Sequence, residues 1–197
     1  TGSYSLHFDN YRDRAVLLFA SSTPEFYIRF GFYPSGSPNQ EQVPIFSIRT
    51  ASDGVQCQLG YSRSYYTLST YRETTLLNTS SAFLTPSAWN LLECYVKVAG
   101  TPDGRFTVKL NGVTIIESTG NVQAQATNAA DILRFGSSYI ASGESGLYGY
   151  LDDIAINDTT GSVNNSWIGQ GGIRPLLVNA DGTNTDLTPS TGTDNYA

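Results

Sequence analysis

The sequence predicts an all-β protein, an antiparallel two-sheet sandwich of the jelly-roll type, and three observations support this. Short runs in which apolar and polar residues alternate recur along most of the chain. Turn-forming stretches such as PSGSPN, TPDG and NG separate these runs. No stretch of helical length carries apolar residues with a period of about 3.6 residues. Many short strands with turns between them are typical of sandwiches and jelly rolls.

The alternating runs define the expected strands. In chain order they cover residues 5–8, 15–19, 26–33, 45–48, 55–61, 91–98, 105–110, 113–118, 132–135 and 150–156. Side chains alternate between the two faces of a strand, so Tyr27, Arg29 and Tyr33 are expected on a polar face opposite the phenylalanines of the same run. Asn111 and Gly112 are expected to form a tight turn between two strands, because both accept positive φ.

The composition excludes several classes of partner. Charged residues make up 14% of the 197 residues, hydrophobic residues make up 40%, and the formal net charge is −6. Nucleic acids and anionic membranes attract basic surfaces, so this acidic protein is expected to bind neither. No window approaches about 18 consecutive apolar residues, so no membrane-spanning helix is expected.

The chain is expected to divide into two parts. Residues 1–157 hold almost all of the alternating runs and are expected to form the sandwich. Residues 158–197 are poor in apolar side chains apart from Trp167 and the run IRPLLV. Such a segment cannot form a core of its own, so it is expected to lie along the sandwich, pinned by Trp167 and one extra edge strand, to pack on a neighbouring molecule, or to remain loose. Trp167 and Trp89 are both expected to be packing anchors.

The two cysteines are expected to be structural. Cys57 and Cys94 each lie in an alternating apolar run, so both are expected to face the core as small hydrophobic side chains. A disulfide between them is the alternative. The sequence has no C-x-x-C pair and no Cys/His cluster, so no zinc site is expected.

The order of several motifs resembles a known family. FYIRFGFYP, IFSI, the stretch WNLLECYVKVAGTPDGRFTVKLNG that starts at Trp89, DILRFG and GLYGYLDDIAIND follow one another within residues 5–158. Together they resemble concanavalin A-like, laminin G-like jelly-roll domains, which carry a Trp-led strand, a hairpin ending in Asn-Gly and a closing strand that opens with acidic residues. The resemblance implies the same two-sheet fold.

The C-terminal part carries a narrower resemblance. The stretch YLDDIAINDTTGSVNNSWIGQGGIRPLLVNADG, followed by LTPSTGTDNYA, is similar to the end of such domains in bacteriophage virion proteins. The resemblance implies a non-enzymatic component of the virion surface, in a tail fibre or as a capsid decoration. Such a component is expected to assemble with other virion proteins and with copies of itself, and host-surface glycans are its candidate ligands. The alternatives are a stand-alone carbohydrate-binding module and a glycan hydrolase.

Catalysis is not expected, and no catalytic residue is assigned. The laminarinase-type glucanases of this architecture use a Glu-x-Asp-x-x-Glu strand to place a nucleophile and a general acid close together. No Glu of this sequence lies in that pattern. His7 is the only histidine, and no Asp or Ser forms a nucleophile motif beside it.

Asp152, in the expected closing strand, requires an explanation. Strict alternation places Asp152 on the same face as Ile154 and Ile156, toward the core. A buried carboxylate needs hydrogen bonds, a counter-charge or a metal. Several members of the wider fold hold a structural calcium with the first acid of this strand, a backbone carbonyl near the N-terminus and water, so the resemblance makes Asp152 a candidate calcium ligand, and Ca²⁺ requires oxygen ligands. The alternatives are hydrogen bonds from backbone N–H groups and an ion pair with an arginine such as Arg134.

A tyrosine-rich run supplies most of the candidate binding residues. Residues 61–72, YSRSYYTLSTYR, combine aromatic rings, guanidinium groups and hydroxyls, which can stack on sugars and read their hydroxyl groups. Tyr and Arg are also favoured at protein interfaces, so contact with a neighbouring subunit is the alternative. The same two interpretations apply to the polar face of the run 26–33. The candidate residues are Tyr65, Tyr66, Tyr71, Arg63, Arg72, Tyr27, Arg29 and Tyr33.

Overall fold

The computed structural model of the chain is an all-β sandwich, as the alternating pattern predicts. It describes residues 5–9, 13–35, 42–136, 147–159 and 165–169. Twelve strands form two antiparallel sheets of six strands each, and the described residues contain no helix. It follows that no helix in this part of the chain has the length and hydropathy needed to cross a bilayer.

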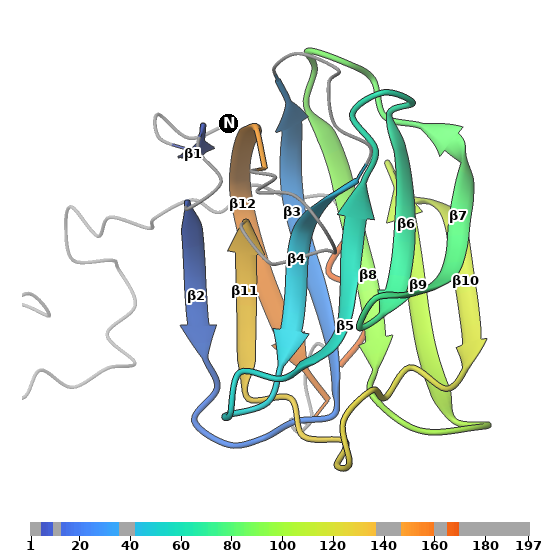
Figure 1. Cartoon of the computed structure of the whole chain (residues 1–197). Coiled ribbons are helices and arrows are strands. Elements are labelled where there is room, and N and C mark those ends of the chain that lie inside the picture. Colours follow the sequence, from blue (N-terminus) through green and yellow to red (C-terminus); the bar gives the residue numbers. More distant parts are fainter. Residues whose placement is uncertain (1–4, 10–12, 36–41, 137–146, 160–164, 170–197) are drawn as a thin grey trace, which may run out of the picture.

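The two sheets lie face to face (Figure 1). Sheet A contains, in spatial order, β1 (Leu6–Phe8), β12 (Gly149–Asp158), β3 (Glu25–Pro34), β8 (Asn90–Lys97), β9 (Gly104–Leu110) and β10 (Val113–Gly120). Sheet B contains β2 (Arg14–Leu18), β11 (Ile132–Gly136), β4 (Val43–Arg49), β5 (Val55–Tyr61), β6 (Thr67–Arg72) and β7 (Thr75–Phe83). Because β3 pairs with both β12 and β8, sheet A brings distant parts of the chain side by side.

Aromatic rings fill the space between the sheets. Phe30 of β3 and Phe46 of β4 are fully buried, and their ring centroids are 6.1 Å apart. Phe135 of β11 lies 5.5 Å from Phe30 in an edge-to-face arrangement, which aromatic pairs prefer. The alternation predicted for β3 is confirmed, because its inward residues are at most 1% exposed. These residues are Phe26, Ile28, Phe30 and Phe32.

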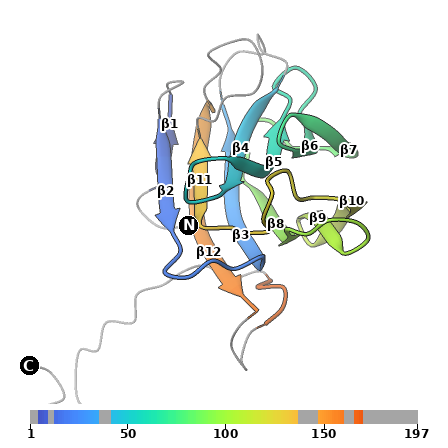
Figure 2. The same ribbon diagram turned by 60° about the horizontal axis from the view of Figure 1, so that its bottom comes forward.

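The edge strands of the two sheets lie at opposite sides of the sandwich, β7 and β10 at one side and β1 and β2 at the other (Figure 2). At the first side β7 meets β10, where the Asn78 side-chain amide donates a hydrogen bond to the backbone carbonyl of Glu117 at 3.2 Å. At the second side Leu6 of β1 and Leu17 of β2 stand opposite fully buried residues of the neighbouring strands, yet they are 44% and 42% exposed. The side formed by β1 and β2 therefore presents apolar side chains to solvent.

The sequence pattern misses β6 and β7 and marks residues 61–72 as a surface instead. In the structure this run is a hairpin that joins the end of β5 to β6. Tyr61 and Tyr71 are only 2% and 8% exposed. Four consecutive residues of β6 are buried, so apolar and polar residues need not alternate there and the pattern gives no strand signal.

The expectation that Asp152 points toward the core is wrong. Leu151 faces the core and is fully buried, so Asp152 lies on the opposite, outer face of sheet A. Its register partner is Gly31, whose outer side is covered by the Trp89 ring. Asp152 is half-buried there, and its carboxylate therefore does not require the compensation that a core position would demand.

A β-bulge in β12 explains the error. The register against β3 shifts between Asp152 and Ala155, and Asp153 adopts a positive φ of 51°. An extra residue in one strand reverses the alternation beyond it, so Ile156 packs against the core although Asp152 does not. Asp152 Oδ1 accepts a hydrogen bond from the Asp153 N–H at 2.8 Å, which is one of the predicted alternatives.

Arg134 does not serve as the partner of Asp152. Its Nη2 donates to Asp53 Oδ1 at 2.7 Å, and Arg49 Nε donates to the same oxygen at 2.7 Å. Arg134 belongs to β11 of sheet B, whereas Asp152 belongs to β12 of sheet A and faces outward. The predicted alternative of an Arg134–Asp152 ion pair is therefore wrong.

The Asp53 cluster is expected to make stability depend on pH below neutrality. Partial burial raises the pKa of the Asp53 carboxyl, but Arg49 and Arg134 lower it more, so its pKa lies below the usual value. A depressed pKa adds stability above the unfolded-state value, and this stability is lost as the pH falls through the folded-state pKa.

Asp53→Asn is therefore expected to cost less than about 1 kcal/mol at pH 7, since the carboxylate is 52% exposed and the pair is screened. Asparagine tolerates the φ of 68° at this position, so the backbone should not change. Urea denaturation at pH 7 and at pH 3 would measure the difference from the unmutated chain. A difference that stays constant with pH would show that the charge of Asp53 contributes nothing.

The cysteines occupy the core as predicted. Cys57 and Cys94 are fully buried, and both are free thiols. Burial raises the pKa of both thiols, which keeps them protonated. A buried, protonated thiol is a poor nucleophile and a poor metal ligand, so neither cysteine is a candidate for chemistry.

The predicted division of the chain falls at the end of β12. The part of the predicted C-terminal segment that the structure describes is 158–159 and 165–169. Residues 165–169 pack on the sandwich, where the Gly169 N–H donates to Glu93 Oε1 at 2.7 Å. Residues 160–164 and 170–197 lie outside the described residues, so the division at residue 157 stays a prediction.

Candidate functional site: an aromatic hollow on sheet A

Four rings form a row across the outer face of sheet A. In the strand register, His7 of β1 pairs with Tyr150 of β12, and Tyr150 pairs with Tyr33 of β3. Trp89 immediately precedes β8 and continues the row beyond Tyr33. Cross-strand partners on one face lie about 5 Å apart at Cβ, so the topology of the sheet alone brings these rings together.

The rings contact one another in sequence along the row. His7 stacks on Tyr150 with the centroids 4.4 Å apart and 11° between the planes. Tyr33 meets Tyr150 edge to face at 5.7 Å, and it meets Trp89 edge to face at 5.6 Å. Each ring is thereby held by its neighbour, and the row forms a preorganised surface.

The row borders an open hollow of about 520 Å³. The residues that line it are Ser5, Tyr33, Ser35, Ser87, Trp89 and Tyr150. They combine aromatic side chains with serine hydroxyls, and none of them is charged. Small-molecule sites usually have volumes of about 300 to 1,000 Å³ and pair aromatic walls with a few polar groups. The hollow has the size and lining of such a site.

Two sets of contacts fix the position of Trp89, one with the sheet beneath the indole and one within the loop that precedes β8. Gly31 lies under the indole, and a Cβ at Gly31 would be 3.3 Å from Cε3 of Trp89. The Asn90 side chain accepts a hydrogen bond from the Thr85 N–H at 2.8 Å and donates to the carbonyls of Thr85 and Ala88 at 3.0 and 2.8 Å. Trp89 therefore packs on the sheet, as predicted for a packing anchor, and it also leaves 40% of its surface exposed beside the hollow.

The tyrosines predicted from the run 61–72 do not form one surface. Tyr65 is 70% exposed in the turn of the β5–β6 hairpin. Tyr66 packs against the core, with its ring 6.2 Å from that of Tyr61. Tyr71 is 8% exposed on the other side of the hairpin's sheet, where it covers Gly60. Only Tyr65 is open to a ligand, and one isolated ring makes a weak site.

The two arginines of the same run, Arg63 and Arg72, are buried or half-buried in the sandwich. Arg63 is 6% exposed, and its guanidinium carbon lies 4.5 Å from the centre of the Tyr148 ring. This geometry is a cation–π contact. Arg72 is half-buried at the end of β6. Neither arginine shares an exposed surface with Tyr65, so the structure does not bring the candidates of this run together.

The polar face predicted for β3 does lie on the outer face of sheet A. Tyr33 lines the aromatic hollow, whereas Tyr27 and Arg29 lie under residues 165–169. Arg29 is 3% exposed, and its guanidinium donates to the carbonyls of Asp153 and Gly169 at 3.2 and 3.3 Å. Of the three residues predicted on β3, only Tyr33 is therefore presented to a ligand.

Residues 165–169 are anchored by Trp167. Its ring meets the Tyr27 ring edge to face at 5.3 Å, and Lys109 Nζ lies 3.7 Å from its centroid. Glu93, the register partner of Arg29, is 4% exposed and accepts the hydrogen bond from Gly169. Within residues 165–169 Trp167 therefore packs on the sandwich, whereas the course of the C-terminal segment as a whole stays a prediction.

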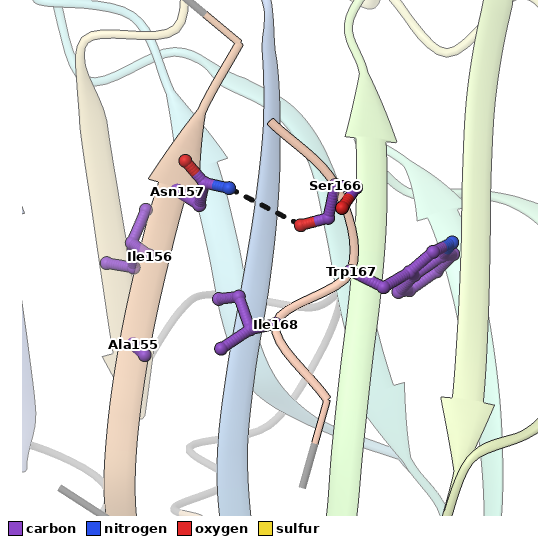
Figure 3. Close-up of a pocket in the computed structure, with 6 residues that line it drawn as sticks. All are labelled: Ala155, Ile156, Asn157, Ser166, Trp167 and Ile168. Carbon is purple, nitrogen blue, oxygen red and sulfur yellow. Dashed lines mark hydrogen bonds between the residues drawn. The ribbon is translucent and has the colours of Figure 1, made fainter. Parts of the chain in front are cut away.

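A smaller cavity of about 360 Å³ lies between β12 and residues 165–169 (Figure 3). Its lining residues are Ala155, Ile156, Asn157, Ser166, Trp167 and Ile168. The Asn157 side-chain amide donates to the Ser166 carbonyl at 3.3 Å, and Trp167 points away from β12 (Figure 3). The described lining has aliphatic side chains, one amide, one serine and a single aromatic ring that points away from β12, whereas the aromatic hollow has three rings, so this cavity is the poorer site.

In the described part of the chain, no cluster of metal-ligating side chains supports the predicted calcium site at Asp152. No group of three or more His, Cys, Asp or Glu side chains is placed there to hold a metal. The argument from a buried carboxylate also no longer applies, since Asp152 faces outward. The calcium site implied by the family resemblance stays a prediction.

The sequence analysis missed Tyr150, Trp89 and His7 as site residues. Their signal is the pairing order of β1, β12, β3 and β8, which places His7 and Tyr33 beside Tyr150, more than a hundred positions away in the chain. Each ring lies in a different segment of the sequence, and no single segment contains two of them. Only the sheet topology shows that they are neighbours.

Solved structures of other proteins share this architecture. Trypanosoma rangeli sialidase in complex with sialic acid matches with a TM-score of 0.57 at 13% identity, over 77% of this chain and 25% of that chain. The endo-beta-1,4-glucuronan lyase of Trichoderma reesei matches with a TM-score of 0.56 at 13% identity, over 81% and 78% of the two chains. The chain has the jelly-roll sandwich fold. The chain spans only about a quarter of the sialidase.

A third structure has the same fold in an assembly. The native heptameric SAP-like pentraxin of Limulus polyphemus matches with a TM-score of 0.50 at 16% identity, over 75% of this chain and 77% of that chain. No protein-family model and no curated protein sequence matches the chain. At these identities the likeness concerns the fold, and the function must be argued from the site.

Proposed function

We propose that this protein is a non-enzymatic glycan-binding module whose binding site is the aromatic hollow on sheet A. The observation that carries the proposal is the row of fixed rings beside serine hydroxyls in an open site of about 520 Å³. Sugar rings present apolar C–H faces and polar edges, and aromatic walls with a few polar groups are suited to both.

The lining of the hollow favours binding over hydrolysis. Glycoside hydrolysis in most families uses two carboxylates placed on either side of the scissile bond. Among the described residues that line the hollow, none carries a carboxylate. The half-buried Asp152 lies on the same face, but its Oδ1 accepts a hydrogen bond from the neighbouring backbone. These features support a binding module.

Trp89→Ala is expected to reduce glycan binding by at least about tenfold, because it removes the largest ring of the site. A glycan array followed by calorimetry on the best oligosaccharide would measure the loss. Tyr65→Ala is the matched control, since Tyr65 is an exposed ring outside the hollow. Loss of binding in Tyr65→Ala with full binding in Trp89→Ala would place the site on the β5–β6 hairpin instead. Cleavage of any bound glycan would contradict the non-enzymatic assignment.

A location on the surface of a phage particle is a second proposal, and it rests on the resemblance of the C-terminal stretch to virion proteins. An exposed apolar edge suits a protein that assembles with copies of itself or with virion proteins. In β2, Val16 is 47% exposed and Leu18 is 68% exposed. Edge strands with free hydrogen-bonding groups and apolar side chains favour contact with another chain. Recovery of the protein on purified particles would support the location, and its absence from them would reject it.

A further inference from the structure

We propose that the aromatic hollow selects uncharged sugars and rejects acidic ones such as sialic acids and uronic acids. This inference rests on the proposed glycan-binding function and specifies its ligand class. The described residues that line the hollow are three aromatic side chains and three serines, and they offer hydroxyl groups and ring faces but no cation.

Two basic residues on this face of sheet A, Arg29 and Lys109, are engaged away from the hollow, and His7, which stacks on Tyr150, is not among the described residues that line it. Arg29 is buried and donates to the carbonyls of Asp153 and Gly169. Lys109 Nζ lies over the Trp167 ring at 3.7 Å. The contacts of Arg29 and Lys109 lie where residues 165–169 cover the outer face of sheet A, and neither residue is among the described residues that line the hollow. A carboxylate in the hollow would find no counter-charge among the described lining residues.

The charge around the hollow disfavours an anion. Asp152 follows Tyr150 by two residues on the same face, which is a separation of about 7 Å along the strand. The chain as a whole carries a formal net charge of −6. An acidic sugar would therefore lose hydration of its carboxylate against aromatic walls and would meet repulsion from Asp152.

An uncharged sugar meets complementary groups in the same place. A pyranose ring can lie on the Trp89 indole, which is held from below by Gly31 and is 40% exposed. Ser35 and Ser87 line the hollow together with Tyr33, and each hydroxyl can both donate and accept a hydrogen bond. Sugar hydroxyls also do both, so neutral donors and acceptors satisfy them without a charge.

The test compares three sets of oligosaccharides on the full chain: neutral hexose and N-acetylhexosamine oligomers, oligouronates, and sialylated oligosaccharides. Calorimetry at 20 mM and 300 mM NaCl is expected to show binding of neutral oligomers only, with an affinity that salt changes less than about twofold. Trp89→Ala is expected to lower this affinity at least about tenfold.

Ser87→Arg places a cation in an exposed position at the hollow and tests the charge argument directly. It is expected to gain measurable binding of oligouronates that falls with salt, whereas the control Ser87→Ala is not. Preference of the unmutated chain for acidic oligosaccharides, lost in Trp89→Ala, would overturn the selectivity but keep the glycan-binding function. Absence of binding to all three sets would overturn both.

Discussion

Phe46→Ala is expected to destabilise the protein by about 3 to 5 kcal/mol, which is the usual cost of removing a fully buried aromatic ring. Phe46 is 0% exposed, and its ring contacts rings from both sheets. Its centroid lies 6.1 Å from Phe30 and 6.1 Å from Phe106 of sheet A, and 5.9 Å from Phe135 of sheet B. The substitution would leave a cavity that both sheets border and neither can fill.

The measurement is urea denaturation followed by intrinsic fluorescence, supported by a thermal scan. For a chain of this size the melting temperature should fall by about 10 °C. Phe83→Ala is the matched control, because Phe83 is 64% exposed on the edge strand β7 and should cost about 0.5 kcal/mol. A cost below about 1 kcal/mol for Phe46→Ala would mean that the sheets do not share a common aromatic core.

The parts of the fold that depend on local alternation could be predicted from the sequence. In β3 the phenylalanines face the core, and Tyr27, Arg29 and Tyr33 face outward, as the period of two residues requires. The turn at Asn111 and Gly112 has positive φ at both residues, as predicted. These features need only the residues of one strand or one hairpin.

The parts that depend on a partner strand could not be predicted. Asp152 was placed on the wrong face because one bulge, with Asp153 at positive φ, reverses the alternation in the second half of β12. A sequence run gives no sign of such a bulge, since Asp-Asp is compatible with a regular strand. The β5–β6 hairpin was mistaken for a surface for a related reason. Its tyrosines are polar enough for solvent and large enough for the core.

The candidate site shows the same limit. Tyr33 could be selected from the polar face of β3, but Tyr150 and His7 become neighbours only through the order β1, β12, β3 in sheet A. Antiparallel pairing between distant segments is set by the whole sandwich. Sheet topology therefore determines which residues meet at a ligand site formed by several strands. The sequence shows which side chains are present but not which of them become neighbours.

The largest electrostatic effect is expected at the buried pair of opposite charges on the outer face of sheet A. Arg29 and Glu93 are direct register partners, and they are 3% and 4% exposed beneath residues 165–169. Arg29→Met or Glu93→Leu alone leaves the other charge buried opposite an apolar side chain, which should cost about 3 to 5 kcal/mol. Glu117→Gln is the control, because Glu117 is an exposed residue of β10, and it should change the unfolding free energy by less than about 0.5 kcal/mol.

The double variant Arg29→Met/Glu93→Leu distinguishes the cost of burying a single charge from the interaction energy between the two charges. Opposite charges buried side by side compensate each other, and their joint replacement by well-packed apolar side chains is often close to neutral, so the double variant should recover to within about 1 kcal/mol of the unmutated chain. The two single costs would then exceed the double cost by several kcal/mol, which measures the coupling. Additive costs would show that the two charges do not interact across β3 and β8.

The same variants should release residues 165–169 from the sheet. Glu93 accepts the Gly169 N–H and Arg29 donates to the Gly169 carbonyl, so the double variant keeps the fold but removes both contacts. In a Trp89→Phe background Trp167 is the only tryptophan, because the chain has two. Its emission should shift to longer wavelength as the ring leaves Tyr27 and Lys109 for solvent. An unshifted spectrum would mean that Trp167 alone holds the segment, through its ring contacts, and that the charged pair beneath it serves only the sheet.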